Sequence, residues 1–358
     1  MSNIINYIEE YKNKTFREEE FNEIDNVVFS SISYLNFLGI IPKQRKYINL
    51  EEALNKFFNK YTYKEVAKYG IAQKDSYEVI KHVVNSKRYR NVLVYNYFYE
   101  SDLNKQFGAL TFKVPGKFIY VSFEGTDNLL SGWKENFEMS YEFLVPAQKC
   151  AIEYLNKNIK LFDRNIIVGG HSKGGNLALV SAMYCKPFIR KKIKKIYSND
   201  GPGLKKIQIE SEEYIKVKDR YNHIVPNYSY VGVLLRNDKY DVIKSNRKDV
   251  LAHSVLTWQI EGNKFLRTDL SLISKNLEKS IILWLDAHDY DDRRKMITKI
   301  FKALEDGEMY TTNDLVNIRK SIKVIKNLNN IDEDTKNLVL NFLKFNLNYI
   351  LKNSKGEF

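Results

Sequence analysis

The segment Asn165–Leu179 constrains the fold of this chain more than any other stretch. It reads as a short apolar run, a glycine-rich turn and the start of a helix built from small residues. Gly170-His-Ser-Lys-Gly174 has the G-x-S-x-G pattern of a nucleophile elbow, in which a strand turns sharply into a helix at the serine. The residues two before and two after the serine must be small there, and both are glycine. The pattern predicts Ser172 at a helix N-terminus, where the helix dipole favours developing negative charge.

The flanking segments predict an α/β protein. Asn91–Tyr99, Phe107–Val114 and Phe118–Phe123 are rich in aromatic and β-branched residues, which is typical of strands. The elbow strand, its helix and a further strand near Ile196–Ser198 follow in βαβ order, which predicts a mostly parallel central sheet with helices on both faces. A short last strand is predicted over Val255–Ile260.

Helical periodicity flanks the sheet on both sides in the sequence. Apolar residues recur at helical spacing over residues 1–35, 50–69 and 75–85, and a capping box is predicted at Thr15-Phe-Arg-Glu18. Helices are again predicted from about residue 264, the last over Asp332–Lys352. We therefore expect an α/β domain over residues 1–263, with a helical N-terminal segment to about residue 88. We also expect a helical C-terminal extension over residues 264–358 that packs on this domain.

Composition limits the partners. The 358 residues are 44% hydrophobic, enough for a substantial core, and 57 Lys+Arg against 44 Asp+Glu give a net charge of +13. The lysines are scattered, and the densest basic run, Arg190–Lys195, reads as a solvated helix end, so no nucleic-acid partner is predicted. Peripheral contact with an anionic membrane through the basic surface and the last helix is an alternative. The oligomeric state is left open.

Cysteine usage and the N-terminus point to a cytoplasmic protein. Cys150 and Cys185 are too few for a disulfide framework, and no Cys/His spacing suggests a metal site or a cofactor. The first ten residues turn acidic where a signal peptide needs an apolar core. No uninterrupted apolar stretch is long enough to cross a bilayer.

A serine at neutral pH needs a base, and the chain has only five histidines. His82 and His288 lie in predicted helices away from the sheet. His171 is the immediate neighbour of Ser172, and neighbouring side chains on an elbow point apart. Of the remaining two, His253 lies just before the last predicted strand, where the base follows the acid in the hydrolase chain order. We therefore predict His253 as the base, with His223 as the other candidate and a capped loop histidine as the alternative.

The predicted acid is Asp200. It ends the strand that follows the elbow helix, in Tyr197-Ser-Asn-Asp-Gly-Pro-Gly203, and a carboxylate at that end of a parallel strand faces the ligand crevice. An ordinary Asx-turn residue is the alternative reading. Asp219 lies near the next strand but adjoins Arg220, and the segment around His223 offers no carboxylate.

An oxyanion hole needs two N–H donors. One is expected from the amide of Lys173, directly after the serine. The other is expected from the loop after an early strand, Phe123-Glu-Gly-Thr-Asp127. Gly125 there lets the backbone approach a substrate closely, and Thr126 offers its amide or its hydroxyl.

The chain resembles the lipase-like α/β-hydrolases that bacteria carry as a domain of unknown function, and more distantly the class 3 (fungal-type) lipases. The specific part of the resemblance is Gly-His-Ser-Lys-Gly-Gly-Asn with a downstream Asp-Gly-Pro-Gly. The matching stretches fall within residues 15–300 and are Phe123–Asp127 with Trp133-Lys134, Val145–Gln148, Gly169–Asn176, Ser198–Gly203, Val225–Leu235 and His253–Trp258.

This resemblance implies an α/β-hydrolase fold and a serine esterase or lipase activity without metal or cofactor. The chain departs from the class 3 pattern, because the place that matches the class 3 acid holds His223. Lys173 is also unusual directly after the serine, although the bacterial family tolerates it. We therefore predict cleavage of a carboxylic ester, such as a small acyl ester or a lipid, by Ser172, His253 and Asp200. A non-catalytic binding or regulatory protein on a hydrolase scaffold is the alternative.

Overall fold

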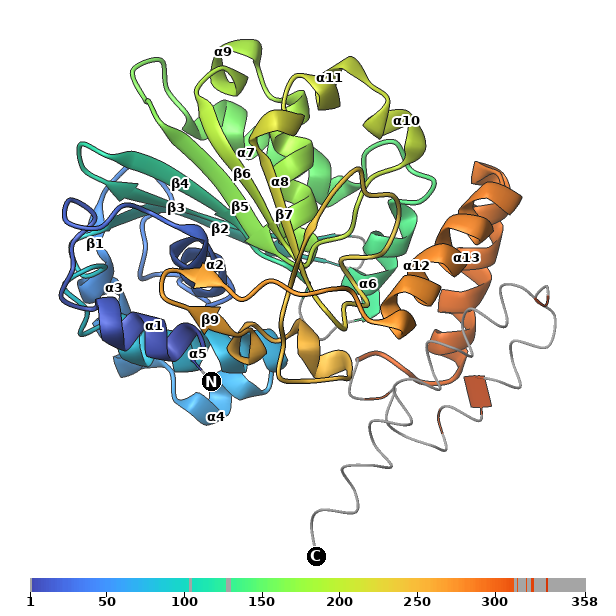
Figure 1. The fold of residues 1–358 in the computed structure, drawn as a ribbon, viewed down its shortest axis with the longest axis horizontal. Coiled ribbons are helices and arrows are strands. Elements are labelled where there is room, and N and C mark those ends of the chain that lie inside the picture. Colours follow the sequence, from blue (N-terminus) through green and yellow to red (C-terminus); the bar gives the residue numbers. More distant parts are fainter. Residues whose placement is uncertain are drawn as a thin grey trace, which may run out of the picture.

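An eight-stranded sheet forms the centre of the molecule, and its strands lie side by side in chain order, β1 to β8 (Figure 1). The computed structural model describes residues 2–102, 105–126 and 130–311, together with positions 314, 320, 323, 324 and 333. Strands β1 to β4 pair antiparallel, and β4 to β8 pair parallel. Helices lie on both faces and at both ends of the chain, so the predicted α/β fold with helical additions is confirmed.

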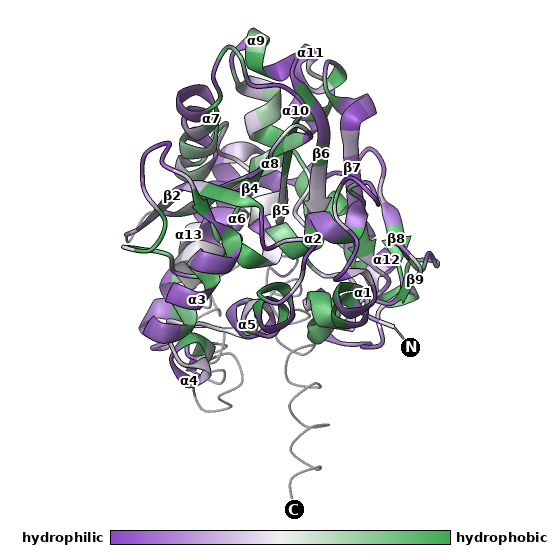
Figure 2. Cartoon of the chain, turned by 90° about the vertical axis from the view of Figure 1, so that its left-hand side faces the viewer, coloured by the Kyte–Doolittle hydropathy of each residue, from purple (hydrophilic) through white to green (hydrophobic). Residues whose placement is uncertain are grey.

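The strands agree closely with the sequence pattern in the middle of the sheet. Strands β4 and β5 are buried along their whole length, as expected for strands covered on both faces, and β4 is coloured hydrophobic in Figure 2. The strands are β1 Ile48–Asn49, β2 Leu93–Ser101, β3 Gln106–Val114, β4 Phe118–Phe123, β5 Ile166–His171, β6 Ile193–Asn199, β7 Tyr221–Pro226 and β8 Asp241–Ile243, with a separate hairpin of β9 Ile260–Glu261 and β10 Lys264–Phe265.

One face of the sheet carries the crossover helices. Parallel strands that follow one another in chain order, joined by right-handed crossovers, have their connecting helices on one side. Helices α7 (Pro146–Asn158) and α8 (Lys173–Tyr184) pack on each other and on this face, with Ile119, Val121 and Val168 in their shared core. The opposite face therefore needs cover from elsewhere in the chain.

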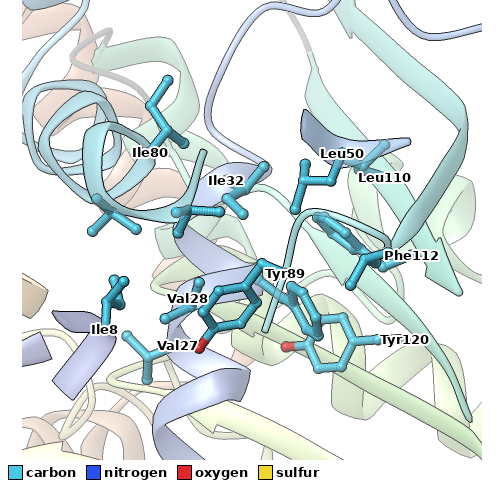
Figure 3. Packing of buried hydrophobic residues seen from close by; sticks show 14 of the residues in the cluster. Ile8, Val27, Val28, Ile32, Leu50, Ile80, Tyr89, Leu110, Phe112 and Tyr120 are labelled. Carbon is cyan, nitrogen blue, oxygen red and sulfur yellow. The ribbon is translucent and has the colours of Figure 1, made fainter. Parts of the chain in front are cut away.

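The N-terminal helices cover that opposite face. Helix α2 (Glu23–Ile32) is almost entirely buried and contacts β4 and β5, with α1 (Ile4–Tyr11) and α5 (Ile71–Val83) packed outside it. Figure 3 shows how its apolar side chains meet those of the sheet and of α5, among them Val28, Ile32, Ile80, Phe112 and Tyr120. The N-terminal segment is thus a structural layer of the domain, completed by α3 (Leu50–Lys60) and α4 (Tyr63–Ala67).

The predicted capping box at Thr15 forms its contacts but starts no helix. The Thr15 amide donates to Glu18 Oε2 at 2.8 Å within a turn, and the helical prediction over residues 1–35 is wrong between α1 and α2. The reason is Arg88, whose guanidinium is buried and donates to the carbonyls of Lys14, Glu19 and Glu20. These contacts hold the segment between α1 and α2 in its turn conformation.

The predicted strand over Val255–Ile260 is also wrong. Val255–Thr257 forms a 3₁₀ turn, and only Ile260–Glu261 enters a short strand. The chain folds back here because the indole of Trp258, fully buried, donates to the carbonyl of Ala252 at 2.8 Å.

Helices α12 (Leu272–Ala287) and α13 (Tyr290–Asp306) form the orange edge of the molecule in Figure 1. Ile281 and Leu285 of α12 share a buried cluster with Val145 and Leu235 of the α/β domain, and α13 packs on α6 (Leu130–Glu138). The last predicted helix, over Asp332–Lys352, lies outside the described residues except for position 333. The remaining short helices are α9 Pro187–Arg190, α10 Lys206–Ile209 and α11 Glu212–Ile215.

Candidate active site

Three neighbouring strands bring the candidate residues to one edge of the sheet. Strands β4, β5 and β6 run parallel, and directly after them come the Gly125-Thr126 loop, Ser172 and Asp200. Ligands of open α/β sheets bind at this carboxyl edge. Segments far apart in the sequence therefore meet at the edge where a ligand site is predicted.

Ser172 occupies the strained backbone position that the elbow motif predicts. Its φ is +58° and its ψ is −134°, and its amide donates to the carbonyl of Asn199 at 2.9 Å. A Cβ on Gly170 would lie 2.3 Å from the carbonyl carbon of Gly174, and one on Gly174 would lie 2.1 Å from the carbonyl oxygen of Phe123. Neither position accepts a side chain, which is the reason for both glycines of the motif.

The predicted oxyanion donors flank this turn. Lys173 begins α8, so its amide is among those that a helix leaves without an intrahelical partner. The Gly125 loop packs directly on the elbow, because a Cβ on Gly125 would lie 2.6 Å from the carbonyl oxygen of His171. The Thr126 hydroxyl accepts a hydrogen bond from Asn136 at 3.2 Å and can still donate through its own O–H, so both this hydroxyl and the amide of Thr126 are candidate donors.

His253 and Asp200 form a hydrogen-bonded pair. The imidazole Nδ1–H of His253 donates to Asp200 Oδ2 at 2.6 Å. The other oxygen, Oδ1, accepts from the Ser229 hydroxyl and, at 3.0 Å, from the Gly232 amide. Asp200 is fully buried, whereas the His253 side chain is 26% exposed. The carboxylate is therefore fixed at both oxygens, and the imidazole is open to a ligand.

The Ser172 hydroxyl and the His253 ring form no hydrogen bond among the described contacts. Such contacts are often long in unliganded enzymes and tighten when substrate binds. What the structure brings together is thus a histidine–aspartate pair beside a serine in elbow geometry.

His171 holds the loop that carries His253. Its Nε2–H donates to the carbonyl oxygen of His253 at 2.9 Å, and the two rings lie 4.4 Å apart. On its other side the Tyr34 hydroxyl lies 2.9 Å from His171 Nδ1 and 3.1 Å from its carbonyl oxygen. Burial and the nearby charge of His253 hold the pKa of His171 well below its usual range, so its ring is neutral and its Nδ1 is an acceptor.

Sequence reasoning set His171 aside because neighbours on an elbow point apart. Its ring nevertheless contacts the backbone of the residue predicted as the base. Only the fold reveals this contact, since 82 residues separate His171 from His253.

A buried carboxylate on α5 anchors the same loop. The Ser254 hydroxyl donates to Asp75 Oδ2, and Asp75 is buried. Burial raises the pKa of Asp75 to about 7, with the hydrogen bond from Ser254 acting in the opposite direction. The loop of His253 is thus held by α5, by His171 and by the indole of Trp258.

Asn176 explains why the Gly-Gly-Asn and Asp-Gly-Pro-Gly motifs occur together. Its amide group donates to the carbonyl of Gly203 at 2.7 Å, and its Oδ1 accepts from Gln148 of α7 at 2.8 Å. A Cβ on Gly201 would lie 2.6 Å from the carbonyl oxygen of Ser172. The first motif therefore holds the loop that begins with Asp200.

Lys173 turns its side chain into a buried ion pair. Its Nζ lies 2.9 Å from Glu135 Oε2 and donates to the Gln106 carbonyl at 2.7 Å, and both charged side chains are almost fully buried. Glu135 Oε1 accepts from the Ala147 amide at the start of α7. The unusual lysine of the motif thus ties the elbow helix to α6 and α7.

The polar layer beneath the elbow comes from the N-terminal segment. Asn26 of α2 donates to Asn199 Oδ1 at 2.7 Å, and the Asn199 amide group donates to Ser30 at 3.1 Å. Since the Asn199 carbonyl also accepts from Ser172, α2 supports the turn through a single residue.

His223 occupies the place that matches the class 3 acid. It is buried in β7, and neither ring nitrogen has a hydrogen-bond partner in the described structure. Burial lowers the pKa of His223 to about 4, so its ring is neutral at pH 7. The carboxylate that pairs with His253 instead follows the preceding strand, at Asp200.

The described residues contain neither a candidate metal site nor a candidate membrane-spanning helix. Their His, Cys, Asp and Glu side chains form no group of three or more suited to hold a metal ion. None of their helices has the length and apolar character to span a membrane.

Fold and site together place this chain in one class of protein. It is an α/β protein that carries a serine at a strand-to-helix elbow, beside a hydrogen-bonded histidine–aspartate pair. The model of the Mbeg1-like family matches residues 83–302, well over half of the sequence, and the chain therefore belongs to the Mbeg1-like family. This is the family of unknown function that the motifs indicate, and the match includes Ser172, Asp200 and His253. No curated protein and no solved structure matches the chain.

Proposed function

We propose that this protein is a serine hydrolase that cleaves a carboxylic ester through an acyl-enzyme intermediate. The observation that carries the proposal is the left-handed Ser172 at the carboxyl edge of the sheet, on the strand next to the one that leads to the Asp200–His253 pair. A strand-to-helix turn with a purely structural role would not need the buried Asp200 carboxylate, held at both oxygens, beside the partly exposed imidazole of His253.

In the acylation step Ser172 Oγ bonds to the ester carbonyl carbon. Its proton passes to His253 Nε2, and Asp200 stabilises the imidazolium that forms. The amides of Lys173 and Thr126 donate to the carbonyl oxygen as it becomes negative, and the N-terminus of α8 adds its dipole. The tetrahedral species then collapses, the bond to the alcohol oxygen breaks, and His253 returns the proton to that oxygen.

Deacylation repeats the sequence with water as the nucleophile. His253 removes a proton from the water, whose oxygen bonds to the acyl carbon, and the proton then returns to Ser172 Oγ as the carboxylic acid leaves. The chemistry needs no group beyond this chain's own residues and water.

Covalent labelling with a fluorophosphonate probe tests this proposal. Wild-type protein is expected to be labelled on Ser172, and Ser172→Ala is expected to lose the label. Ser181→Ala, on the same helix with its hydroxyl bonded to the carbonyl of Ala178, is the matched control and is expected to be labelled like wild type. Folded wild-type protein that takes up no probe, or equal labelling of Ser172→Ala, would overturn the proposal. p-Nitrophenyl esters of increasing chain length then define the acyl group.

His171→Phe is expected to lower the turnover of such an ester by about 10- to 100-fold, because the carbonyl of His253 loses the donor that fixes its loop. The phenyl ring keeps the shape of the side chain, so KM is expected to change little. Tyr34→Phe, which removes only the hydroxyl that contacts His171, is expected to have a smaller effect in the same direction. Turnover unchanged in both variants, with only a lower melting temperature, would show that His171 has a purely structural role.

A further inference from the structure

A cavity of about 200 Å³ lies between the C-terminal helices and the loop that follows β6. Lys205, Lys206 and Arg236 line it from the α/β domain, and Arg293 of α13 lines it from the other side. Asp286 of α12 is the one carboxylate of its lining. Four cationic side chains therefore face a space that a single acid shares with them.

Two of these cations have no carboxylate partner among the described ion pairs. The buried Lys205 Nζ donates to the backbone carbonyl of Glu142, and the guanidinium of Arg293 donates to the carbonyls of Ser140 and Leu285. The Nε of Arg293 is buried and has no hydrogen-bond partner in the described structure. Carbonyl dipoles satisfy the hydrogen bonds of a cation without neutralising its charge, so positive charge remains beside the cavity.

Among the described ion pairs, the other two cations contact exposed acids. Arg236 contacts Asp286, whose side chain is 59% exposed, and Lys206 lies 4.0 Å from the exposed Glu210. Exposed pairs of this kind contribute little and are readily exchanged for a better partner. The lining can therefore offer all four cations to an anion.

An aromatic ring contacts both cations that have no described carboxylate partner, Lys205 and Arg293. The Tyr290 ring centroid lies 5.5 Å from Lys205 Nζ and 5.1 Å from the guanidinium carbon of Arg293, and both contacts are of cation–π type. Burial lowers the pKa of Lys205 to about 8; Glu142 acts against this shift, and the charge of Arg293 adds to it. A bound anion would relieve this repulsion.

From this arrangement we infer that the cavity binds a phosphate group. A phosphate monoester carries close to two negative charges at pH 7 and has three acceptor oxygens. Its charge matches the two cations without a described carboxylate partner, Lys205 and Arg293, and its oxygens can accept hydrogen bonds from all four cationic side chains of the lining. Arginine and lysine together supply a planar fork and a point charge, the usual combination for phosphate. A free phosphate ester and the phosphate of a lipid headgroup present the same chemistry to the cavity.

The test measures binding of inorganic phosphate to the full chain by calorimetry at constant ionic strength. Wild type is expected to bind saturably, and Lys205→Gln and Arg293→Gln are expected to bind about tenfold more weakly or worse, because each loses a charged hydrogen-bond donor. Lys206→Glu reverses a charge on a side chain that is 70% exposed, so it weakens binding without disturbing packing. Lys295→Gln is the control. It removes an exposed charge from α13, the helix of Arg293, at a position outside the cavity lining, and it is expected to bind phosphate like wild type.

A second arm separates the two sources of phosphate. Sedimentation with phosphatidylcholine vesicles that contain phosphatidic acid is expected to be lost in Lys206→Glu and Arg293→Gln if a lipid headgroup fills the cavity. Binding of inorganic phosphate alone supports a free ester. Wild type that binds neither form saturably, or variants of the lining that bind as wild type does, would overturn the inference. Ser172→Ala is expected to bind phosphate normally, so this result is independent of the proposed hydrolase activity.

Discussion

Asp200→Asn is expected to lower the rate of fluorophosphonate labelling of Ser172 on the order of 10⁴-fold, the effect of the same change on the acid of other serine hydrolases. The contacts of the carboxylate explain why. Asp200 Oδ1 accepts from the Ser229 hydroxyl and the Gly232 amide, so the one oxygen of an asparagine stays on that side. Its NH₂ group then faces His253 Nδ1, which must act as an acceptor. The proton moves to Nε2, and that nitrogen can no longer take the proton of Ser172.

The matched control for this prediction is Asp219→Asn. It makes the same chemical change at an exposed aspartate nineteen residues further along, and its labelling rate is expected to equal that of wild type. Circular dichroism and the melting temperature check that Asp200→Asn is folded. A folded Asp200→Asn protein that is labelled within tenfold of wild type would mean that Asp200 is not the acid and that Ser172 is activated without it.

The parts of the fold that the sequence predicts well are those fixed by local constraints. The predicted strand Phe118–Phe123 has the same bounds in the structure, because its residues alternate between two cores and both faces are buried. The elbow is equally local, since the turn at the left-handed Ser172 leaves no room for a side chain two positions before or after it, at Gly170 and Gly174. Such features depend on residues within a few positions of one another.

The features that sequence reasoning missed depend on residues far away in the chain. The turn at Thr15 has a capping-box pattern, yet its neighbouring carbonyls bind Arg88, more than seventy positions later. The segment near Val255 has strand composition, but Trp258 folds it back on Ala252. The hydrophobic pattern within either segment contains no information about these long-range contacts.

The candidate site divides in the same way. Chain order and the elbow motif selected Ser172, Asp200 and His253, and the structure places the last two within hydrogen-bonding distance. The residues that position them, among them His171 and Asp75, could not be selected from sequence. Their roles arise from contacts between loops and helices that only the fold brings together.

Asn26, whose amide contacts Asn199 beneath the elbow, adjoins Asp25, which forms the most buried ion pair of the N-terminal layer. Asp25 accepts from Arg88 Nε at 2.8 Å, from its Nη2, and from the Tyr89 hydroxyl at 2.6 Å. Neither charged side chain is exposed to solvent. This pair joins α2 to the segment that leads into β2, and it thereby holds the layer that supports the site.

Arg88→Met is expected to lower the free energy of unfolding by about 3–5 kcal/mol, because it leaves the Asp25 carboxylate buried without a cation. It also removes the donor to the carbonyls of Lys14, Glu19 and Glu20, so the link between α1 and α2 loses its fixed course. Urea unfolding measures the loss. The control, Arg294→Met, breaks an exposed pair with Glu142 and is expected to cost about 0–1 kcal/mol. An equal, small loss in both variants would show that the buried pair contributes no more than a surface one, and that apolar packing of α2 alone holds this layer on the sheet.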